Sequence, residues 1–382
     1  MAGWPGRRGS ALRIVLATQW FPPDTGGVSS HVRDLALKLV EKGHEVTVIT
    51  RHGRGLEGVD TVWLRRGDYV RFPASLAGSG EVAKLLRELD PEVVHSHHAF
   101  TPIPLMTLAT ASSLEYPTIL TNHSAYLNGY EHLLRALGSI ALPIKALVSR
   151  ADEIVAVSRA AAEFIQAFAP RRSVKVIPNG VDVEKFNPRG ATPLRDTLAS
   201  EFIVLFVGRL VWRKGLLQLV KAIALLDDIN ATLIVVGEGP LRWRAEVLAE
   251  TLGVRDRTVF LGRVRDSELP GIYRSADVVV VPSVYGESFG IVALEAMASG
   301  RPVVASRVGG LSEVVVDGET GILVQPGSPR SIAEALLALH QDRSLARKLG
   351  LNARRIVVER YSWKRLLSKL LETYERLSAG HC

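Results

Sequence analysis

The sequence predicts an α/β fold of two doubly wound domains, each built on a parallel sheet. Short apolar runs alternate with helical patterns along most of the chain, and the alternation restarts once after a turn-rich interval. The 382 residues are 47% hydrophobic and 23% charged, which is enough to bury a large core. This composition excludes intrinsic disorder and collagen-like structure.

The first domain opens with a βαβ pattern. A strand is predicted at Arg13–Thr18, and apolar residues from Val28 to Val40 then lie on one face of a helix that stops at Gly43. The next strand is Glu45–Thr50. Further strands are predicted at Val93–His95, Thr118–Thr121, Ile154–Val157 and Val174–Ile177.

The second domain follows a turn-rich interval from Pro178 to Gly190, within a linker expected near residues 178–195. We expect a first domain over residues 1–188, a second over 189–360, and a terminal segment, 361–382, whose amphipathic helix can pack back on the first domain. The second set of strands is predicted at Phe202–Val207, Thr232–Val236, Val259–Leu261, Val278–Val281, Val303–Ala305 and Ile322–Val324. Helices are expected between them, for example at Gly215–Leu226 and Leu241–Leu252.

Charge and cysteine content limit the partners. The formal net charge is +8, and the excess of Lys and Arg is the same in each half of the chain. Because no basic arm carries this charge, we do not expect a nucleic-acid partner. The single cysteine, Cys382, excludes a disulfide within the chain and a cysteine-rich metal site, and it favours a reducing, cytoplasmic location.

Two segments have features associated with membrane targeting or membrane contact. The stretch from Met1 to Ser10 and the apolar run after it resemble a signal peptide, but Arg13 breaks the run, which we interpret as the first strand. No stretch is long and apolar enough to span a bilayer. Residues Tyr126–Ile154 form a basic amphipathic pattern that fits either the core or peripheral contact with a membrane surface.

Candidate ligand contacts follow the predicted strands. Gly26–Gly27 comes before a helix start and fits either a tight turn or close approach of a ligand. Arg209 and Lys214, in the loop after the strand at Phe202–Val207, fit a solvated turn or, as we favour, a diphosphate.

Backbone exposed after two more strands could recognise a nucleobase. Gly237 and Glu238 follow the strand at Thr232–Val236, and Arg263 and Val264 follow the strand at Val259–Leu261. Each of these turns is a weak signal alone. Together they lie where ligands bind in open parallel sheets, beyond the carboxyl ends of the strands.

A pair of glutamates is the most informative pattern. Glu287 precedes a predicted helix start, and Glu295 lies about two turns into that helix. Two carboxylates beside an apolar helix can accept hydrogen bonds from the hydroxyls of a sugar or ribose, or they can simply be solvated. Backbone N–H groups at the helix start are available to phosphates, and the residues there are Phe289, Gly290, Ile291 and Val292.

The histidines leave several interpretations open. His95 and His97 could chelate zinc from one strand, but no third ligand of the usual kind is apparent, so we predict no metal site. His123 follows the strand at Thr118–Thr121. It fits a polar contact to substrate or a hydrogen-bonded core histidine equally well.

In this set of motifs the chain resembles the retaining family 4 glycosyltransferases of the GT-B fold. The likeness rests on Gly26–Gly27, on the histidine after a strand of the first domain, and on four further motifs, in family order from about Arg13 to Gln325. These are Ile177-Pro178-Asn179-Gly180-Val181-Asp182, Gly208-Arg209 with Lys214-Gly215, Gly237-Glu238-Gly239-Pro240, and Glu287 with Glu295.

The resemblance implies roles for these residues. Arg209 and Lys214 would bind the donor diphosphate, Glu295 would hold the ribose, and Glu287 and His123 would contact the transferred sugar. Gly26–Gly27 would line the junction of donor and acceptor. The donor would be a UDP- or GDP-sugar, transferred with α-linkage and without a cofactor or catalytic metal.

Two stretches narrow the resemblance. Arg209–Gly215 and Thr121–Ser124 are similar to those of the enzyme that adds N-acetylglucosamine to phosphatidylinositol in GPI-anchor synthesis, and phosphatidylinositol mannosyltransferases are further relatives. An inositol lipid at a membrane face is therefore the expected acceptor. The alternatives are a soluble acceptor, a GT-B-like nucleotide-sugar epimerase, and a binding module without turnover, which the intact motifs argue against.

Overall fold

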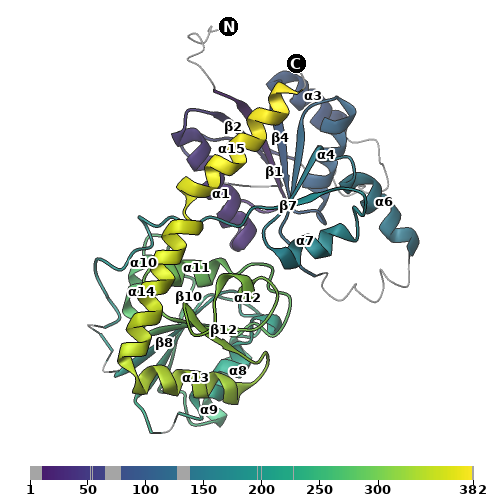
Figure 1. Ribbon diagram of the computed structural model, residues 1–382. Coiled ribbons are helices and arrows are strands. Elements are labelled where there is room, and N and C mark those ends of the chain that lie inside the picture. Colours follow the sequence, from purple (N-terminus) through teal and green to yellow (C-terminus); the bar gives the residue numbers. More distant parts are fainter. Residues whose placement is uncertain are drawn as a thin grey trace. The chain divides into compact units, whose positions relative to one another are not determined.

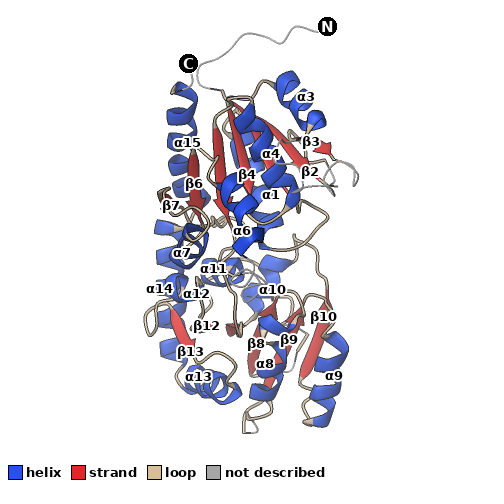
Figure 2. Ribbon diagram, turned by 90° about the vertical axis from the view of Figure 1, so that its right-hand side faces the viewer, coloured by secondary structure: helices blue, strands red, loops and turns tan. Residues whose placement is uncertain are grey.

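The buried runs of the sequence form two separate parallel sheets, with helices on both faces of each (Figures 1 and 2). The structure, a computed structural model, describes residues 11–51, 53, 55–64, 79–126, 138–195, 197–198, 200–226 and 228–380. The chain divides into two compact units. Unit 1 comprises residues 1–178 and 367–382, and unit 2 comprises residues 179–366.

Unit 1 contains a sheet with the strand order β3-β2-β1-β4-β5-β6-β7, in which every pair of neighbours is parallel. Residues Ile14–Ala17 of β1 are at most 1% exposed, as expected for a strand covered on both faces. The strands are β1 (Arg13–Thr18), β2 (Glu45–Thr50), β3 (Asp60–Trp63), β4 (Val93–His97), β5 (Thr118–Asn122), β6 (Glu153–Ala156) and β7 (Val174–Val176).

The helices of unit 1 differ in burial: α1 buries one face, whereas α4 buries every residue from Ile103 to Ala111. On α1 the buried side chains, among them His31, Val32 and Leu35, recur at helical spacing and pack beside β1 and β2. In another layer α4 contacts both α3 and α6. The helices are α1 (Gly27–Glu41), α3 (Gly80–Leu89), α4 (Pro102–Ser113), α6 (Gly138–Val148) and α7 (Arg159–Gln166).

Unit 2 contains a parallel sheet with the order β10-β9-β8-β11-β12-β13. The strands are β8 (Phe202–Val207), β9 (Ala231–Val236), β10 (Thr258–Gly262), β11 (Val278–Val281), β12 (Val303–Ser306) and β13 (Gly321–Val324). Helix α8 contacts α9 and α13, and α11 contacts α10, α12 and α14. The helices are η1 (Trp212–Lys214), α8 (Leu216–Ile223), α9 (Arg242–Thr251), α10 (Leu269–Ser275), α11 (Ile291–Ala298), α12 (Leu311–Val314), α13 (Pro329–Gln341) and α14 (Arg343–Arg360).

The boundary between the units differs from the predicted one. Residues 179–188, expected in the first domain, belong to unit 2 because its C-terminal part holds their backbone. The Val181 N–H donates to the Tyr361 carbonyl at 2.9 Å, and the Arg354 guanidinium donates to the carbonyls of Phe186 and Val183 at 2.8 and 2.9 Å. At the other end, the boundary falls inside α15 (Trp363–Ala379).

The segments predicted to bear on membranes are only partly described. Residues 1–10, residues 127–137 of the region Tyr126–Ile154, and Cys382 lie outside the described residues. Within the described part of that region, Leu147 and Val148 pack in the core of unit 1. Among the helices that the structure describes, none has the length and apolar character needed to cross a membrane.

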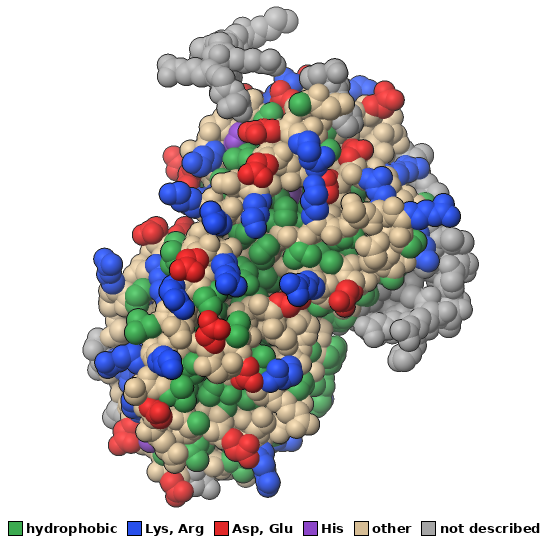
Figure 3. All heavy atoms as spheres, in the orientation of Figure 1, with side chains coloured by type: hydrophobic (Ala, Val, Ile, Leu, Met, Phe, Trp, Pro, Cys, Tyr) green, Lys and Arg blue, Asp and Glu red, His purple; other side chains and the backbone are tan. Residues whose placement is uncertain are grey.

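Basic and acidic side chains are interspersed on the face drawn in Figure 3. Lys and Arg occur beside Asp and Glu over the described parts of both units, and no single-sign patch dominates this view. The positive excess seen in the sequence is therefore dispersed on this face.

Candidate active site

In each sheet, the loops that follow the strands bring polar side chains together at one edge. All strands in a sheet are parallel, so the loops that follow them lie at the same edge. The predicted site residues fall into two groups. Gly26, Gly27 and His123 belong to unit 1, and all the others belong to unit 2.

In unit 2, the loops after β8 and β11 meet in an ion pair. Lys214 Nζ lies 2.5 Å from Glu287 Oε2, and both side chains are largely buried, at 17% and 11% exposed. The Ser283 hydroxyl donates to the same carboxylate oxygen at 2.8 Å. Arg213 adds a second contact by donating to the Gly286 carbonyl at 3.1 Å.

This arrangement keeps Glu287 ionised. Burial by itself would raise the pKa of the carboxyl, but the positive charges of Lys214 and Arg213 and the hydrogen bonds from Lys214 and Ser283 hold the pKa below its ordinary value. The hydrogen bonds from Lys214 and Ser283 both use Oε2. Glu287 Oε1 makes no hydrogen bond with any described residue, so it can accept one from a ligand hydroxyl.

Close packing at Gly215 fixes the loop after β8. A Cβ atom at Gly215 would lie 1.9 Å from the Pro282 carbonyl oxygen, so only glycine lets η1 and α8 approach the end of β11 this closely. Arg209 precedes this point and is exposed. Its guanidinium makes no hydrogen bond or ion pair with the described residues, so its charge is available to an anion.

The glycines after β9 have a packing role that the sequence did not indicate. A Cβ atom at Gly237 would lie 2.0 Å from the Gly208 carbonyl oxygen. The loops are also joined by backbone bonds, from Gly237 N–H to Gly262 O at 2.8 Å and from Leu210 N–H to Glu238 O at 2.9 Å. The loops after β8, β9 and β10 therefore form one connected rim.

The predicted base contacts lie on this rim. The side chains of Glu238 and Arg263 are exposed, and Val264 is half-buried. A ligand approaching the rim meets their backbone and side chains together.

Helix α11 offers its N-terminus without a side-chain cap. Gly290 has φ +97° at the cap position, and within the described parts of the chain no side chain bonds the first N–H groups, those of Ile291 and Val292. Phe289 is a different case. Its ring is buried and lies 6.0 Å, centroid to centroid, from the ring of Tyr361. Phe289 therefore stabilises the loop before α11 by packing, and its side chain does not face a ligand.

Glu295 is held by a residue that sequence reasoning missed. The Tyr273 hydroxyl, buried in α10, donates to Glu295 Oε2 at 2.7 Å. Burial, together with the carboxylate, raises the pKa of Tyr273 well above its ordinary value, so the hydroxyl keeps its proton and remains a donor. A single tyrosine in a short helix gives no pattern from which this contact could be predicted.

In unit 1, Gly26–Gly27 begins α1. Gly26 caps the helix with φ +140°, and its carbonyl accepts from the Ser30 N–H at 3.0 Å. A Cβ atom at Gly26 would meet nothing within 4 Å. The space beside this glycine is therefore open, in contrast to the packed glycines of unit 2.

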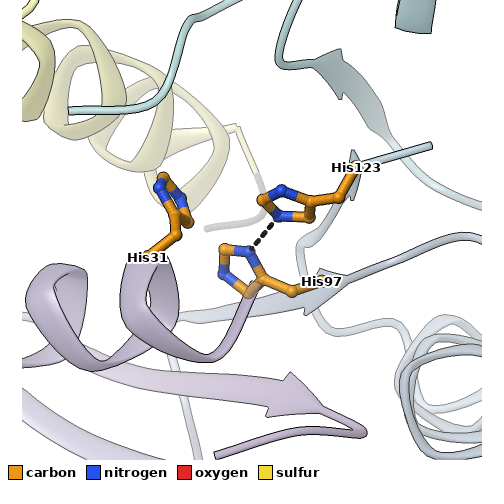
Figure 4. Close-up of side chains that lie close together, drawn as sticks. All are labelled: His31, His97 and His123. Carbon is orange, nitrogen blue, oxygen red and sulfur yellow. Dashed lines mark hydrogen bonds between the residues drawn. The ribbon is translucent and has the colours of Figure 1, made fainter. Parts of the chain in front are cut away.

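His123 lies in a cluster of three buried imidazoles (Figure 4). Its Nε2 lies 3.2 Å from Nδ1 of His97, the last residue of β4, and its ring centroid lies 5.1 Å from that of His31 on α1. Burial, followed by the charges that neighbouring imidazoles would carry, holds the pKa of His123 well below its ordinary value. The ring is therefore neutral at physiological pH.

His95 does not take part in this cluster as a possible metal ligand. His95 Nδ1 lies 2.7 Å from the Tyr374 hydroxyl and Nε2 lies 2.6 Å from the Thr121 hydroxyl, so both ring nitrogens are already in use. The third imidazole that the sequence did not indicate is His31. It was hidden because it lies on a helix, far along the chain from the other two.

These features together define an α/β enzyme with the GT-B architecture, in which two parallel-sheet units each present a loop rim. Two family models match the chain. The model described as Glycosyltransferase Family 4 matches residues 25–185, and the model described as Glycosyl transferases group 1 matches residues 196–356. The chain belongs to this family of glycosyltransferases.

Curated relatives match along almost the whole chain. An uncharacterised glycosyltransferase of Methanocaldococcus jannaschii is 34% identical, covering 95% of this chain and 98% of its own. A GDP-mannose-dependent alpha-(1-6)-phosphatidylinositol monomannoside mannosyltransferase of Mycobacterium tuberculosis is 32% identical, covering 94% and 97%. A D-inositol 3-phosphate glycosyltransferase of an Arthrobacter species is 32% identical, covering 92% and 90%.

A solved structure has the same fold. Sucrose-phosphate synthase from Thermosynechococcus elongatus matches with a TM-score of 0.80 and 26% identity, covering 96% of this chain and 99% of its own. The fold and the family together establish that the protein is a glycosyltransferase, as the sequence motifs predict.

Proposed function

We propose that this enzyme transfers a sugar from a UDP- or GDP-sugar to a hydroxyl of an inositol-containing acceptor, with retention of configuration and formation of an α-linkage. The observation that carries the donor side is the ion pair of Lys214 and Glu287, together with the exposed Arg209 earlier in the same loop as Lys214. It combines an available cation, a second cation held in place, and a carboxylate with an unused oxygen. A nucleotide diphosphate joined to a sugar presents the complementary charges and hydroxyls.

The acceptor class rests on the relatives. One of them is named for a phosphatidylinositol mannoside and another for inositol 3-phosphate, so an inositol ring is common to both names. The first of these names specifies a phospholipid, and the second specifies an inositol phosphate without a lipid. If this chain uses a lipid acceptor, the enzyme works at the surface of a membrane, as the sequence motifs also predict.

The chemistry requires stabilisation of a departing nucleotide. As the glycosidic bond to the diphosphate breaks, negative charge grows on the phosphate oxygens, and in this proposal Arg209 and Lys214 balance it. The N–H groups at the start of α11 add further positive potential. Because these groups supply the electrophilic support, we propose that catalysis needs no divalent metal.

The sugar and the ribose have separate partners in this scheme. Glu287 Oε1 accepts from a hydroxyl of the transferred sugar, and Glu295, fixed by Tyr273, accepts from the ribose. His123 contacts the sugar from unit 1 as a neutral imidazole, which can donate or accept one hydrogen bond. No carboxylate of the enzyme is required as a nucleophile if the leaving phosphate helps to deprotonate the acceptor.

The first experiment identifies the donor. Thermal unfolding of the wild type and of Glu295→Ala is followed with UDP-, GDP- and ADP-sugars in the presence of EDTA. A ligand at about 100 times its dissociation constant stabilises the folded protein by about 2.7 kcal/mol. We expect stabilisation by one UDP- or GDP-sugar and none in Glu295→Ala.

The second experiment tests transfer. The stabilising donor is incubated with inositol phosphate or with phosphatidylinositol vesicles, and nucleotide release and the anomeric configuration of the product are measured. An α-linked product formed in EDTA supports the proposal. Nucleotide release without an inositol product would overturn the acceptor class, a β-linked product would overturn retention, and epimer formation without any acceptor would identify an epimerase.

A further inference from the structure

Three histidines from separate elements converge at the carboxyl edge of the unit 1 sheet (Figure 4). His31 comes from α1, His97 ends β4, and His123 follows β5. One ring nitrogen of each lies within 4.8 Å of a ring nitrogen of the other two. Strands β4 and β5 are neighbours in the sheet, so the backbone itself brings two of the rings together.

One pair of nitrogens already has the spacing that a tetrahedral metal ion requires, and a ring nitrogen of His31 lies within 4.8 Å of a ring nitrogen of each of the other two. His97 Nδ1 and His123 Nε2 are 3.2 Å apart. Two imidazole nitrogens bound to one zinc ion at the usual distance are separated by about 3.3 Å in a tetrahedral site. In the hydrogen-bonded pair one ring supplies a proton, so binding an ion between them requires that ring to change tautomer.

The protonation state of the rings suits metal binding. Burial lowers the pKa of His31 to about 4, and burial first, with neighbouring imidazoles second, holds the pKa of His97 well below its ordinary value. Neutral rings keep a lone pair, so protons do not compete for the ligand atoms at physiological pH. The three side chains are 6%, 0% and 8% exposed for His31, His97 and His123, which holds the rings in place.

A neighbouring histidine helps to fix the geometry. The ring of His95 lies 4.0 Å from that of His97, centroid to centroid, and is itself tied to Tyr374 and Thr121. His95 therefore packs against His97 and restricts its ring position, and it is not itself a ligand. His97 Nε2 is buried and has no hydrogen-bond partner among the described residues, so the cluster is not explained as a completed hydrogen-bond network.

We propose that His31, His97 and His123 form a tris-histidine site for a divalent transition-metal ion of the zinc class, with a fourth position open to water or an anion. Three imidazoles suit zinc, cobalt or copper and do not suit magnesium or calcium, which prefer oxygen ligands. If His123 contacts the sugar, as proposed above, the bound ion withdraws that ring from the sugar. The ion is then an inhibitor and not a catalytic metal.

Cobalt provides the direct test. Full-length protein stripped with EDTA is titrated with Co²⁺, and the visible absorption that four-coordinate Co²⁺ gives much more strongly than six-coordinate Co²⁺ is recorded. We expect one equivalent with a four-coordinate spectrum, displaced by Zn²⁺ and not by Mg²⁺. Only a weak six-coordinate spectrum would overturn the proposal.

Variants assign the ligands. His31→Gln is expected to weaken Co²⁺ binding by at least about 100-fold, and His123→Gln serves the same purpose if the first variant fails to fold. His340→Gln, which changes a histidine on α13 of unit 2, is the matched control and should bind as the wild type does. Wild-type affinity in both cluster variants, or loss of binding in the control, would place the ion elsewhere.

The consequence for activity rests on the proposed function and is measured separately. Zn²⁺ should inhibit sugar transfer by the wild type, EDTA should restore it, and His31→Gln should resist Zn²⁺. If Co²⁺ binds at the three histidines but Zn²⁺ does not inhibit, the metal site stands and the role of His123 in sugar contact is wrong.

Discussion

At the scale of single residues, the site of unit 2 depends on charges that are held before any ligand arrives. Glu287 Oε2 is committed to Lys214 and Ser283, which fixes the carboxylate and leaves its other oxygen for a ligand. Glu295 is fixed in a similar way by the Tyr273 hydroxyl. Preorganised polar groups of this kind do not have to reorient when the substrate binds.

The ion pair at Glu287 makes stability depend on pH in a defined direction. Its pKa in the folded protein lies below the ordinary value, so the ionised carboxylate contributes stability above the ordinary pKa of glutamate. That contribution is lost as the pH falls through the depressed folded-state pKa. We therefore expect Glu287→Gln to lower the free energy of unfolding by about 1–3 kcal/mol at pH 7, and the difference from wild type to close in acid.

Urea unfolding at a series of pH values measures this difference. The matched control is Glu246→Gln, which breaks the more exposed pair between Arg242 and Glu246 (3.1 Å) on α9 and should cost no more than about 1 kcal/mol. An equal loss of stability in the two variants at pH 7 would contradict the prediction. So would a Glu287→Gln effect that persists unchanged in acid.

The contact between Tyr273 and Glu295 is expected to matter for binding. Tyr273→Phe removes the hydroxyl but keeps the ring, which packs 5.7 Å from that of Phe186, centroid to centroid. Loss of one hydrogen bond to a charged carboxylate, worth about 1.5–3 kcal/mol, should weaken nucleotide-sugar binding about 10- to 150-fold. Isothermal titration of the stabilising donor measures the effect, and unchanged affinity would show that Glu295 needs no support.

At the scale of elements, the loops that carry the site are packed too tightly for any residue except glycine at certain points. Gly237 has φ +126°, and a Cβ atom there would lie 2.0 Å from the Gly208 carbonyl oxygen. This contact joins the loops after β8 and β9. The position of Arg209, the next residue, depends on that junction.

A pair of glycine variants separates packing from backbone strain. Gly237→Ala and Gly26→Ala place alanine at similar positive φ values, +126° and +140°, but a Cβ atom at Gly26 would meet nothing within 4 Å. Overpacking usually costs about 1–3 kcal/mol, so Gly237→Ala should be less stable than Gly26→Ala by about that amount. Thermal unfolding compares the two, and equal stability would mean that the loops can move apart freely.

The strands show which elements can be predicted from the sequence and which cannot. Strands covered on both faces leave continuous apolar runs, so β8 and β11 begin and end where the sequence predicts. Strand β3 was missed, because Asp60–Trp63 is short, lies at the edge of the sheet, and has exposed residues at both ends. Periodicity detects burial, and an edge strand has little of it.

The site shows the same limit. Glu287 and Lys214 could be predicted because each follows a strand in a recognisable motif. Tyr273 and His31 could not, because their partners are brought to them by packing between elements distant in the chain. Contacts of this kind leave no local spacing to detect.

At the scale of the whole molecule, the two units differ in how the chain builds them. Unit 2 is one continuous stretch, residues 179–366, whereas unit 1 takes residues 1–178 and returns for residues 367–382. The returning segment buries Leu370 and Tyr374, and the Tyr374 hydroxyl bonds His95 at 2.7 Å beneath the histidine cluster. Arg376 also pairs with the buried Glu153. Leu370 and Tyr374 of this segment are therefore part of the core of unit 1.

Fragments of the chain test this difference. Residues 179–366 alone should fold cooperatively, because all the backbone of unit 2 is present. Residues 1–178 alone should be unstable, since removing residues 367–382 exposes buried apolar side chains and leaves His95 without its tyrosine partner, a loss of at least about 1–3 kcal/mol from the hydrogen bond alone. A synthetic peptide of residues 363–382 should bind the 1–178 fragment and restore cooperative unfolding, and the same peptide with Tyr374→Phe should bind more weakly.

Circular dichroism during thermal unfolding, with and without the peptides, measures the stability of each fragment and its rescue by the peptide. A 1–178 fragment that unfolds cooperatively and ignores the peptide would show that the returning segment is not needed to complete unit 1.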